Sequence, residues 1–370
     1  MFSCCDRISV EYCYSCMHGP EGCMAQSRQG DGTELNVHSE ELEDNGKSTI
    51  FKQMKIIHVD GFKQEKELLQ YRYLIDSNIR DSYLQLIRGC RALGISIEPI
   101  EHLISEINEI YGPMAMELSV RTIPSLVRPL NAFWASEQIQ EAYKRRYEFE
   151  LMDSTKFYLD NLLRIAEPGY FPNEEDIVHS RQPTTTISTI SFNYTGLSLR
   201  MVDVGGQKSE RKKWLHLFDD AQVVLFVIDL TGYAKRSDES RNEMYRFPKL
   251  FKGFNSDAYD MKVALKIFNE VAMNKSLQNA EFLLFFNKVD QFKELLPQVK
   301  LVNCFTKFEG ENTYEPTTSF ICDKFVGAAR QKKSVFPHFT TATNTENVKH
   351  VFRACMESVF KANSKATGLS

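Results

Sequence analysis

A lysine and a hydroxyl group follow a glycine at Gly46-Lys47-Ser48, which is the end of a phosphate-binding sequence pattern. Such a loop points backbone N–H groups at an anion, places a lysine on the outer phosphates and offers a hydroxyl ligand to Mg²⁺. A helix that began here would add the positive end of its dipole. The full pattern requires glycine at position 41, where this chain has Glu41. A short Gly-Lys-Ser run occurs by chance in many proteins, so this motif alone is a weak signal.

Asp203-Val204-Gly205-Gly206-Gln207 is the second candidate motif, and it follows a segment with strand-like alternation. A carboxylate at the end of a strand can hold Mg²⁺ directly or through water. The glycine pair lets the backbone approach a terminal phosphate, and Gln207 could orient an attacking water. The alternative interpretation is an ordinary turn that ends a strand.

Asn287-Lys288-Val289-Asp290 has the chemistry to bind guanine. Asp290 can accept two N–H donors from the Watson–Crick edge of guanine, an arrangement that adenine lacks, and the resulting discrimination is on the order of 10⁴ or more. Asn287 would bond the other edge of the base, and Lys288 would lay its aliphatic stem on the ring. Thr341-Ala342-Thr343 could add a backbone N–H to the base carbonyl. A chance match would be a surface charge cluster, but the ordered occurrence of the three motifs argues against chance.

Helices are predicted over residues 61–168 and at the C-terminal end. Apolar residues such as Leu68, Tyr71 and Ile75 recur three and four apart, which is the mark of one buried helix face. A similar spacing begins at Thr345 and predicts a terminal amphipathic helix.

Strands are predicted in the second half of the chain. Residues 190–194 and 197–201 alternate in polarity around Thr195-Gly196, which predicts a hairpin. Three apolar runs are further strand candidates: Val223–Ile228, Phe282–Phe286 and the weaker Val335–Phe339. Strands that alternate with helices indicate an α/β fold, in which the helical block is an insertion. Because ligands of open α/β sheets bind at the carboxyl ends of the strands, we expect the three motifs to form one site.

Composition limits the classes of function that the chain can have. Its 370 residues suggest two domains or one large domain with an insertion, and the net charge of -4 gives no basic footprint for nucleic acid. No secretory segment precedes the nine cysteines, so a disulfide framework is not expected. No apolar run is long enough to span a bilayer, so membrane contact would come from a lipid or a partner. Cys4 and Cys5 are either lipidation sites or unmodified thiols.

From residue 46 to residue 370 the chain resembles the alpha subunits of heterotrimeric G proteins. Four segments carry the resemblance, in this order: GKSTIFKQMKIIH, DVGGQKSERKKWLH, NKVDQF and HFTTAT. It implies a P-loop GTPase fold, with a mostly parallel six-stranded sheet, helices on both faces and an inserted all-helical domain. The implied GTPase domain comprises residues 46–60 and 180–370, and the implied helical domain comprises residues 61–179. Residues 1–45 are a divergent N-terminal segment.

The resemblance also implies a GTP/GDP switch that uses Mg²⁺ and hydrolyses GTP. It identifies residues 176–185 as the first switch, with Arg181 as a built-in arginine finger beside the catalytic Gln207. Ser48 and Thr184 are the implied Mg²⁺ ligands. The implied nucleotide-binding residues are Glu43, Asp44, Asn45, Gly46, Lys47, Ser48, Thr49, Val178, His179, Ser180, Arg181, Thr184, Asp203, Gly206, Gln207, Asn287, Lys288, Asp290 and Ala342.

The implied partners are a beta-gamma dimer, an effector and a seven-helix receptor. The second switch, at residues 208–214, would face the beta-gamma dimer or the effector, and the C-terminal helix would dock with the receptor. The expected location is the cytoplasmic face of the plasma membrane, as a peripheral protein. Phe2 replaces the glycine required for myristoylation, so palmitoylation of Cys4 or Cys5 is the candidate anchor.

The phosphate-binding loop departs from the family sequence GAGESGKS. Glu41 and Glu43 stand in place of two glycines, and each adds a side chain and a negative charge beside a polyanion. The strand expected before Gly46 would fall on residues 35–40, which are not apolar. We therefore predict weakened nucleotide binding, slow hydrolysis or both. Either the loop is truly degenerate, or residues 1–45 are a wrongly predicted exon.

Two other functions compete with the GTPase switch. A catalytically impaired pseudo-GTPase could keep the fold and serve as a binding or scaffold subunit, which the acidic loop motivates. A kinase-type ATPase is disfavoured by Asn287 and Asp290.

An insertion between Tyr245 and Ala264 interrupts what should be one helix. It contains Pro248 and Gly253, and proline inside a helix costs about 3 kcal/mol. We therefore expect a looped-out bulge, near the effector-facing surface of the family.

Overall fold

The computed structural model describes residues 7–12, 45–111, 123–182, 184, 186–205, 215–219, 221–236, 259–329 and 335–366. Of residues 7–12, 215–216 and 360–366 it describes the backbone alone. The chain divides into a sheet unit (residues 1–47, 183–341 and 350–370) and a helical unit (residues 48–182 and 342–349). Within the described ranges, no helix has the length and apolar character needed to cross a membrane. The cysteines in this part of the chain are free thiols: Cys90, Cys304, Cys322 and Cys355.

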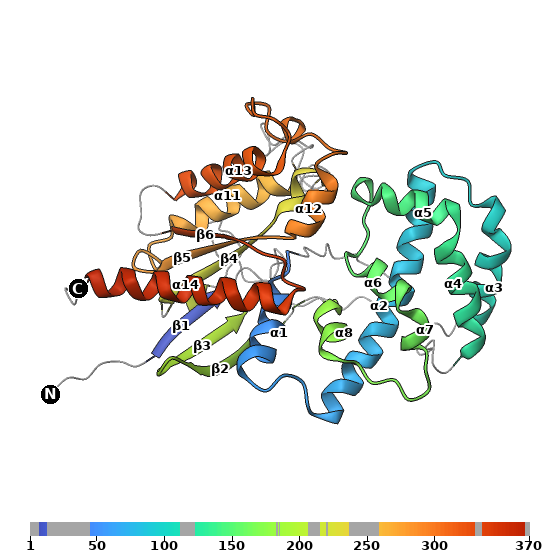
Figure 1. The fold of residues 1–370 in the computed structure, drawn as a ribbon, viewed down its shortest axis with the longest axis horizontal. Helices are drawn as coiled ribbons and strands as arrows, with labels where there is room; N and C mark the ends of the chain where they lie inside the picture. Colours follow the sequence, from blue (N-terminus) through green and yellow to red (C-terminus); the bar gives the residue numbers. More distant parts are fainter. Residues whose placement is uncertain are drawn as a thin grey trace, which may run out of the picture. The chain divides into compact units, whose positions relative to one another are not determined.

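The sheet unit is built on a six-stranded sheet with strand order β2-β3-β1-β4-β5-β6 (Figure 1). Only the β2–β3 pair is antiparallel, and the other neighbours run parallel. The strands are β1 (Arg7–Tyr12), β2 (Ser188–Tyr194), β3 (Leu197–Asp203), β4 (Val223–Asp229), β5 (Glu281–Asn287) and β6 (Val335–Phe339). The predicted α/β fold with a mostly parallel sheet of six strands is confirmed.

The β2–β3 hairpin closes through a two-residue turn, as its sequence predicts. Thr195 and Gly196 both have positive φ, at 47° and 85°. A turn with two such residues matches the twist of the paired strands, and glycine adopts positive φ at little cost. The turn fixes the register, in which Ser188 pairs with Asp203 at the far end. Asp203 is thereby placed at the carboxyl end of β3.

Strand β1 corrects the sequence prediction that the strand before the phosphate-binding motif is missing. The segment 35–40, where that strand was sought, lies outside the described residues. Instead, the backbone of Arg7–Tyr12 lies between β3 and β4 and pairs in parallel with both. The sequence interpretation missed it because Arg7, Ser9 and Glu11 interrupt the apolar run that is typical of a central strand.

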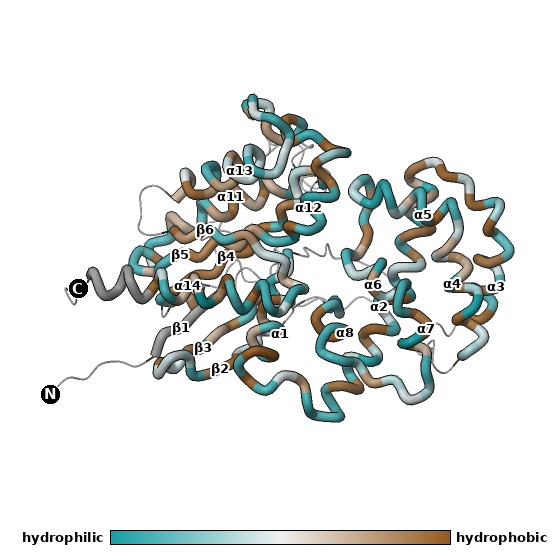
Figure 2. The backbone as a smooth tube through the Cα atoms, in the orientation of Figure 1, coloured by the Kyte–Doolittle hydropathy of each residue, from teal (hydrophilic) through white to brown (hydrophobic). Residues whose placement is uncertain are grey.

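One face of the sheet is covered by helices α11 (Asp260–Ala272) and α13 (Tyr314–Ala328) (Figure 1). The ring of Phe268 in α11 lies 5.0 Å from that of Phe226 in β4, between ring centroids. The ring of Phe325 in α13 lies 5.6 Å from that of Phe286 in β5. Strands β4 and β5 are buried nearly along their whole length, and Figure 2 colours them as hydrophobic. The predicted runs at residues 223–228 and 282–286 are therefore core strands.

The terminal helix α14 (Thr345–Ala366) contributes to the other face. The Phe352 ring centroid lies 5.4 Å from that of Tyr194 and 6.2 Å from that of Phe192, both in β2. Following the strand register from β2 to β4 puts Phe192 and Phe226 on opposite faces of the sheet. Helices therefore cover both faces, as predicted.

The helical unit has its own apolar core around helix α2. Buried Ile75, Ile79 and Tyr83 form the predicted face of this helix, and the Tyr83 ring lies 4.9 Å from that of Phe133. The helices of this unit are α2 (Glu65–Ala92), α3 (Glu101–Tyr111), α4 (Val127–Ala135), α5 (Glu137–Lys144), α6 (Thr155–Asp160), α7 (Leu162–Ile165) and α8 (Glu174–His179). Helix α1 (Lys47–His58) also lies in it, apart from Lys47. The predicted domain boundaries stay a prediction.

Most of the predicted insertion lies outside the described residues, which stop at Arg236 and resume at Tyr259. Arg236 and Tyr259 form an antiparallel bridge, and the guanidinium of Arg236 lies 4.1 Å from the centroid of the Tyr259 ring. The N–H of Asp260 donates to the carbonyl of Lys235 at 3.1 Å. The described residues on either side of this gap therefore lie side by side, and α11 begins directly after Tyr259.

Gly89, in the last turn of α2, provides a test of this packing. A Cβ at this position would lie 2.3 Å from Cε2 of Phe149, so Gly89→Ala forces the ring to move. Overpacking typically costs about 1–3 kcal/mol, and alanine regains about 1 kcal/mol of helix propensity. We expect a net loss of about 1 kcal/mol in the free energy of unfolding, measured by chemical denaturation. The double variant Gly89→Ala/Phe149→Leu should recover stability; if it loses more, the contact with Phe149 is not the cause.

Candidate nucleotide-binding site

The turn after β5 carries the candidate guanine motif. β5 ends at Asn287, and Lys288 precedes α12 (Val289–Leu295) in a left-handed conformation, with φ 64° and ψ 40°. The N–H of Val289 donates to the carbonyl of Thr340 at 3.2 Å, and the N–H of Thr340 donates to the carbonyl of Phe286 at 2.8 Å. The turns after β5 and β6 are therefore bonded to each other through their backbones.

The Asn287 side chain ties three segments of the sheet unit together. Its Nδ2 donates to the backbone carbonyl of Asn45 at 3.0 Å, and its Oδ1 accepts from the hydroxyl of Thr340 at 3.2 Å. Asn287 is buried, so these bonds replace water that its amide has lost. This side chain positions the residue before Gly46 as well as the base motif. Its predicted contact with a base edge stays a prediction.

Lys288 is buried, and its Nζ lies 2.9 Å from Oδ2 of Asp229, the last residue of β4. Asp290, in contrast, is exposed in the first turn of α12. A carboxylate at the solvent edge of this turn is accessible to a ligand. This geometry is compatible with the predicted roles, in which Asp290 bonds the edge of the base and the Lys288 stem packs on its ring.

The start of α1 provides the candidate phosphate-binding residues. Gly46 has φ 87°, a left-handed conformation that glycine adopts without strain, and Lys47 is 5% exposed. Ser48 and Thr49 follow in the first turn of the helix and are half-buried. Glu41, Glu43 and Asp44 lie outside the described residues.

The second motif is described only in part. Asp203 is buried at the carboxyl end of β3, and Val204 and Gly205 after it are also buried. Gly206 and Gln207 lie outside the described residues. Thr184, from the predicted first switch, is half-buried.

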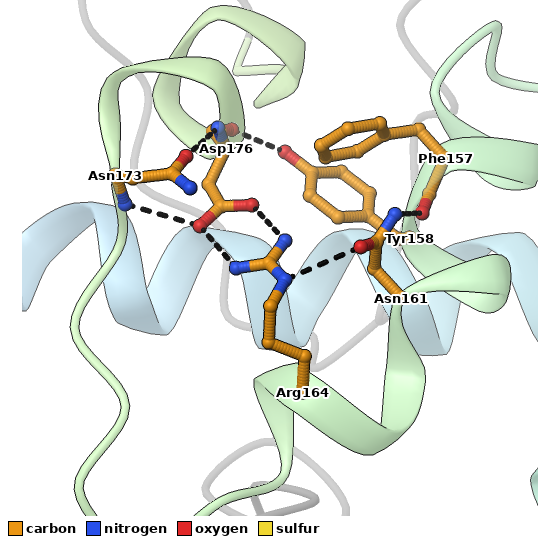
Figure 3. Close-up of polar contacts among 6 residues, drawn as sticks. All are labelled: Phe157, Tyr158, Asn161, Arg164, Asn173 and Asp176. Carbon is orange, nitrogen blue, oxygen red and sulfur yellow. Dashed lines mark hydrogen bonds and ion pairs between the residues drawn. The ribbon is translucent and has the colours of Figure 1, made fainter.

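In the helical unit, Asp176 anchors the helix that leads to Arg181 (Figure 3). This carboxylate, fully buried, accepts two bonds from the guanidinium of Arg164, at 2.6 and 3.0 Å. It also accepts from the N–H of Asn173 at 3.0 Å, while the Asn173 side chain accepts from the N–H of Asp176 at 2.8 Å. This reciprocal capping box starts α8. The hydroxyl of Tyr158 donates to the Asp176 carbonyl at 2.9 Å.

Two side chains then hold the backbone of Ser180 and Arg181. Nζ of Lys52 in α1 donates to the carbonyl of Ser180 at 2.5 Å and to that of Ile177 at 3.0 Å. Oδ1 of Asn78 in α2 accepts from the N–H of Arg181 at 2.7 Å, and Nδ2 of Asn78 donates to its carbonyl at 2.9 Å. Both peptide groups of Arg181 are therefore bonded to one buried amide, which fixes the direction in which its side chain leaves the backbone.

The other predicted residues of this unit have identifiable partners. Val178 is buried, and the imidazole of His179 stacks on the ring of Phe157 with a centroid distance of 3.9 Å. The carbonyl of Ala342, also buried, accepts from Nε2 of Gln53 at 2.9 Å. This bond fixes the peptide between Ala342 and Thr343 to helix α1.

Sequence reasoning missed the residues that support the motifs. Asp229 and Asn78 belong to no predicted motif, and their spacing in the chain does not connect them to one, whereas Asp176 lies in the predicted first switch without an assigned role. Lys52 lies inside the GKSTIFKQMKIIH segment, so a search for a second lysine near the motif could have found it.

The side chains of the predicted Mg²⁺ site fit that ion by their chemistry. Hydroxyls from Ser48 and Thr184 and the carboxylate of Asp203 are hard oxygen donors of the kind that Mg²⁺ prefers, with phosphate oxygens and water completing its shell. Within the described ranges, no group of three or more His, Cys, Asp or Glu side chains could hold a metal ion.

Comparison with known proteins decides the family. A family model described as the G-protein alpha subunit matches residues 42–359. The chain belongs to the G-protein alpha subunit family. The guanine nucleotide-binding protein alpha-14 subunits of Caenorhabditis elegans and Caenorhabditis briggsae are 65% and 63% identical to it, and each comparison covers all of both chains. The alpha-11 subunit of C. elegans is 34% identical over 87% of this chain and 89% of its own length.

Membership of the G-protein alpha subunit family confirms the resemblance found in the sequence and the P-loop GTPase fold with a helical domain. It accounts for the conjunction of guanine, phosphate and switch motifs, because this family consists of GTP-binding signal transducers. The family match begins at residue 42, close to Gly46, whereas the two alpha-14 comparisons also cover residues 1–41.

The Arg164–Asp176 pair can be tested by its effect on stability. Arg164→Ala leaves the fully buried Asp176 carboxylate without its cation, a change that costs about 3–5 kcal/mol in buried pairs. Arg164 is 38% exposed, so we expect a smaller loss, about 2 kcal/mol in the free energy of unfolding. The matched control is Lys156→Ala, which breaks the exposed pair with Asp160 and should cost less than about 1 kcal/mol. Equal losses in the two variants would contradict the anchoring role of Asp176.

Proposed function

We propose that this chain is the guanine nucleotide-binding alpha subunit of a heterotrimeric G protein, which switches between GTP and GDP states and hydrolyses GTP. The observation that carries the proposal is the turn after β5. There Asn287 is bonded to Asn45 and Thr340, Lys288 is held in a left-handed conformation, and Asp290 is exposed. This arrangement supports a guanine site formed by the carboxyl ends of β5 and β6.

The proposed nucleotide contacts divide by chemistry. Asp290 accepts the N–H donors of guanine, and the backbone of Ala342 bonds the base carbonyl. Lys47 and the backbone N–H groups from residue 43 to residue 49 bind phosphate oxygens. Ser48 and Thr184 ligate Mg²⁺, while Asp203 holds it through water, so the cation neutralises phosphate charge. Residues Val178 to Arg181 line the ribose and phosphate side.

For hydrolysis, Arg181 and Gln207 are the proposed catalytic residues. Arg181 stabilises charge on the transferred phosphoryl group, and Gln207 orients the attacking water. The bonds from Lys52 and Asn78 to the backbone support this role, because a guanidinium stabilises a transition state only when its direction is fixed beforehand.

The proposed partners follow from the family. They are a beta-gamma dimer, a seven-helix receptor contacted by α14, and an effector contacted by the second switch. The proposed location is the cytoplasmic face of the plasma membrane, with palmitoylated Cys4 or Cys5 as the anchor.

One observation favours a second candidate, a pseudo-GTPase that binds partners without turnover. β1 ends at Tyr12 and α1 begins at Lys47, so residues 13–46 stand where the P-loop pattern has a short glycine-rich connection. Glu41 and Glu43 in this segment add negative charge. Weak phosphate binding would slow or abolish hydrolysis while leaving the base motif in place.

Nucleotide binding and hydrolysis by the purified full-length chain decide between the two candidates. We expect GDP to bind at least about 10⁴-fold more tightly than ADP, and GTP hydrolysis to require Mg²⁺. Arg181→Ala should reduce kcat by about 10³-fold or more, a general figure for arginine fingers, with GDP affinity little changed. Arg128→Ala, an exposed arginine of α4, is the matched control. GDP and beta-gamma binding without measurable hydrolysis would select the pseudo-GTPase.

Asn78 should affect hydrolysis through Arg181. Asn78→Ala removes both bonds to the Arg181 backbone, and we expect kcat to fall about 10-fold with unchanged GDP affinity. Asn78→Asp keeps the acceptor for the Arg181 N–H but sets a buried carboxylate oxygen against the Arg181 carbonyl, so its kcat should fall at least as far as that of Asn78→Ala. Ser77→Ala, which does not contact Arg181 by any hydrogen bond described, is the control. A change in GDP affinity instead of kcat would contradict this role.

A further inference from the structure

Four polar contacts of the Asp229 carboxylate are described inside the sheet unit. Its Oδ1 accepts from the N–H and the hydroxyl of Thr231, at 2.7 and 2.6 Å. Its Oδ2 lies 2.9 Å from Nζ of Lys288 and 3.5 Å from Nζ of Lys235. The Asp229 and Lys288 side chains are 10% and 8% exposed, so this is an almost buried ion pair at the candidate base site.

The topology brings the two residues together. β4 and β5 are parallel, and Asp229 pairs with Asn287 in their register, so Asp229 lies beside the turn that contains Lys288. Thr231, in the short helix after β4, fixes the carboxylate from its own chain segment. The bonds from Thr231 therefore hold the Asp229 carboxylate in place independently of its contact with Lys288.

The strained backbone and the burial of Lys288 mean that its ammonium group requires a carboxylate partner. Its backbone is left-handed, which is uncommon for a residue other than glycine, and its charge is removed from water. A buried ammonium retains its charge and a single geometry only when it is paired and hydrogen-bonded. Asp229 supplies the short contact with Nζ, and this contact limits the directions that the aliphatic stem can take.

We propose that Asp229 is a positioning residue for purine nucleotides, acting through Lys288. This inference rests on the proposed function and on the sequence-based expectation that the Lys288 stem packs on the base. With Nζ held by Asp229, the stem offers a fixed apolar surface to a purine ring, and binding loses no further rotamer freedom of that side chain. Because a stem contacts guanine and adenine rings alike, Asp229 sets purine affinity, whereas Asp290 sets the choice between bases.

Binding of fluorescent GDP, with GDP and ADP as competitors, tests the proposal in the full-length chain. Asp229→Asn should weaken GDP and ADP by the same factor, about 10-fold, so that the ratio of the two affinities stays constant. Asp290→Ala should instead reduce that ratio. Lys235→Ala is the control, because Lys235 contacts the same carboxylate at 3.5 Å but belongs to no base motif; its GDP affinity should stay within about 2-fold.

A double-mutant cycle separates positioning from a general structural role. If Asp229 acts through Lys288, Asp229→Asn should have no further effect on GDP affinity in a Lys288→Met background. Additive losses, or an unchanged affinity in Asp229→Asn, would overturn the inference. If Asp229→Asn does not fold, Asp229→Glu replaces it in the test. This variant keeps the negative charge but displaces it from Lys288, so we expect it to fold and to lose GDP affinity. A wild-type chain that binds no GDP overturns the proposed function, whereas GDP binding that is insensitive to Asp229 overturns only the inference.

Discussion

The sheet depends on one constraint, the presence of a strand between β3 and β4. Both strands run parallel to β1 and exchange their backbone hydrogen bonds with it, so without β1 each would present an unpaired edge in the middle of the sheet. Pairing with β1 also aligns the carboxyl ends of β3 and β4, where Asp203 and Asp229 lie. The chemistry at these strand ends therefore depends on residues 7–12, which carry no functional motif.

A second principle recurs in both units: a buried polar side chain fixes a backbone segment that carries a functional residue. Asn287 holds Asn45, Asn78 holds Arg181, and Asp176 holds the start of α8. Each of these polar side chains is removed from water, and leaving one without hydrogen bonds would cost about 1–3 kcal/mol. The backbone geometry that makes these hydrogen bonds is therefore strongly favoured over geometries that break them. Apolar packing provides most of the stability of each unit, but it is these polar contacts that specify direction at the site.

The sequence predicted the elements whose patterns are local. The hairpin around Thr195-Gly196, the apolar strand at residues 282–286 and the α2 face at Ile75 follow from turn chemistry and periodicity, because neighbouring residues determine them. It did not predict β1, since Arg7, Ser9 and Glu11 make the segment resemble an edge strand. Nor could it predict the partnership of Asp229 with Lys288, because only the parallel register of β4 and β5 brings these distant residues together.

The long connection between β1 and α1 costs the fold little stability. Loop closure costs about 0.6 kcal/mol for each doubling of length, so extending a P-loop of about eight residues to residues 13–46 costs only about 1 kcal/mol of stability. A phosphate cradle, in contrast, requires several backbone N–H groups to converge on one anion. Gly46 and Lys47 keep the geometry of a helix start. The turn after β5 and the start of α1 therefore persist in a stable fold despite the long connection between β1 and α1.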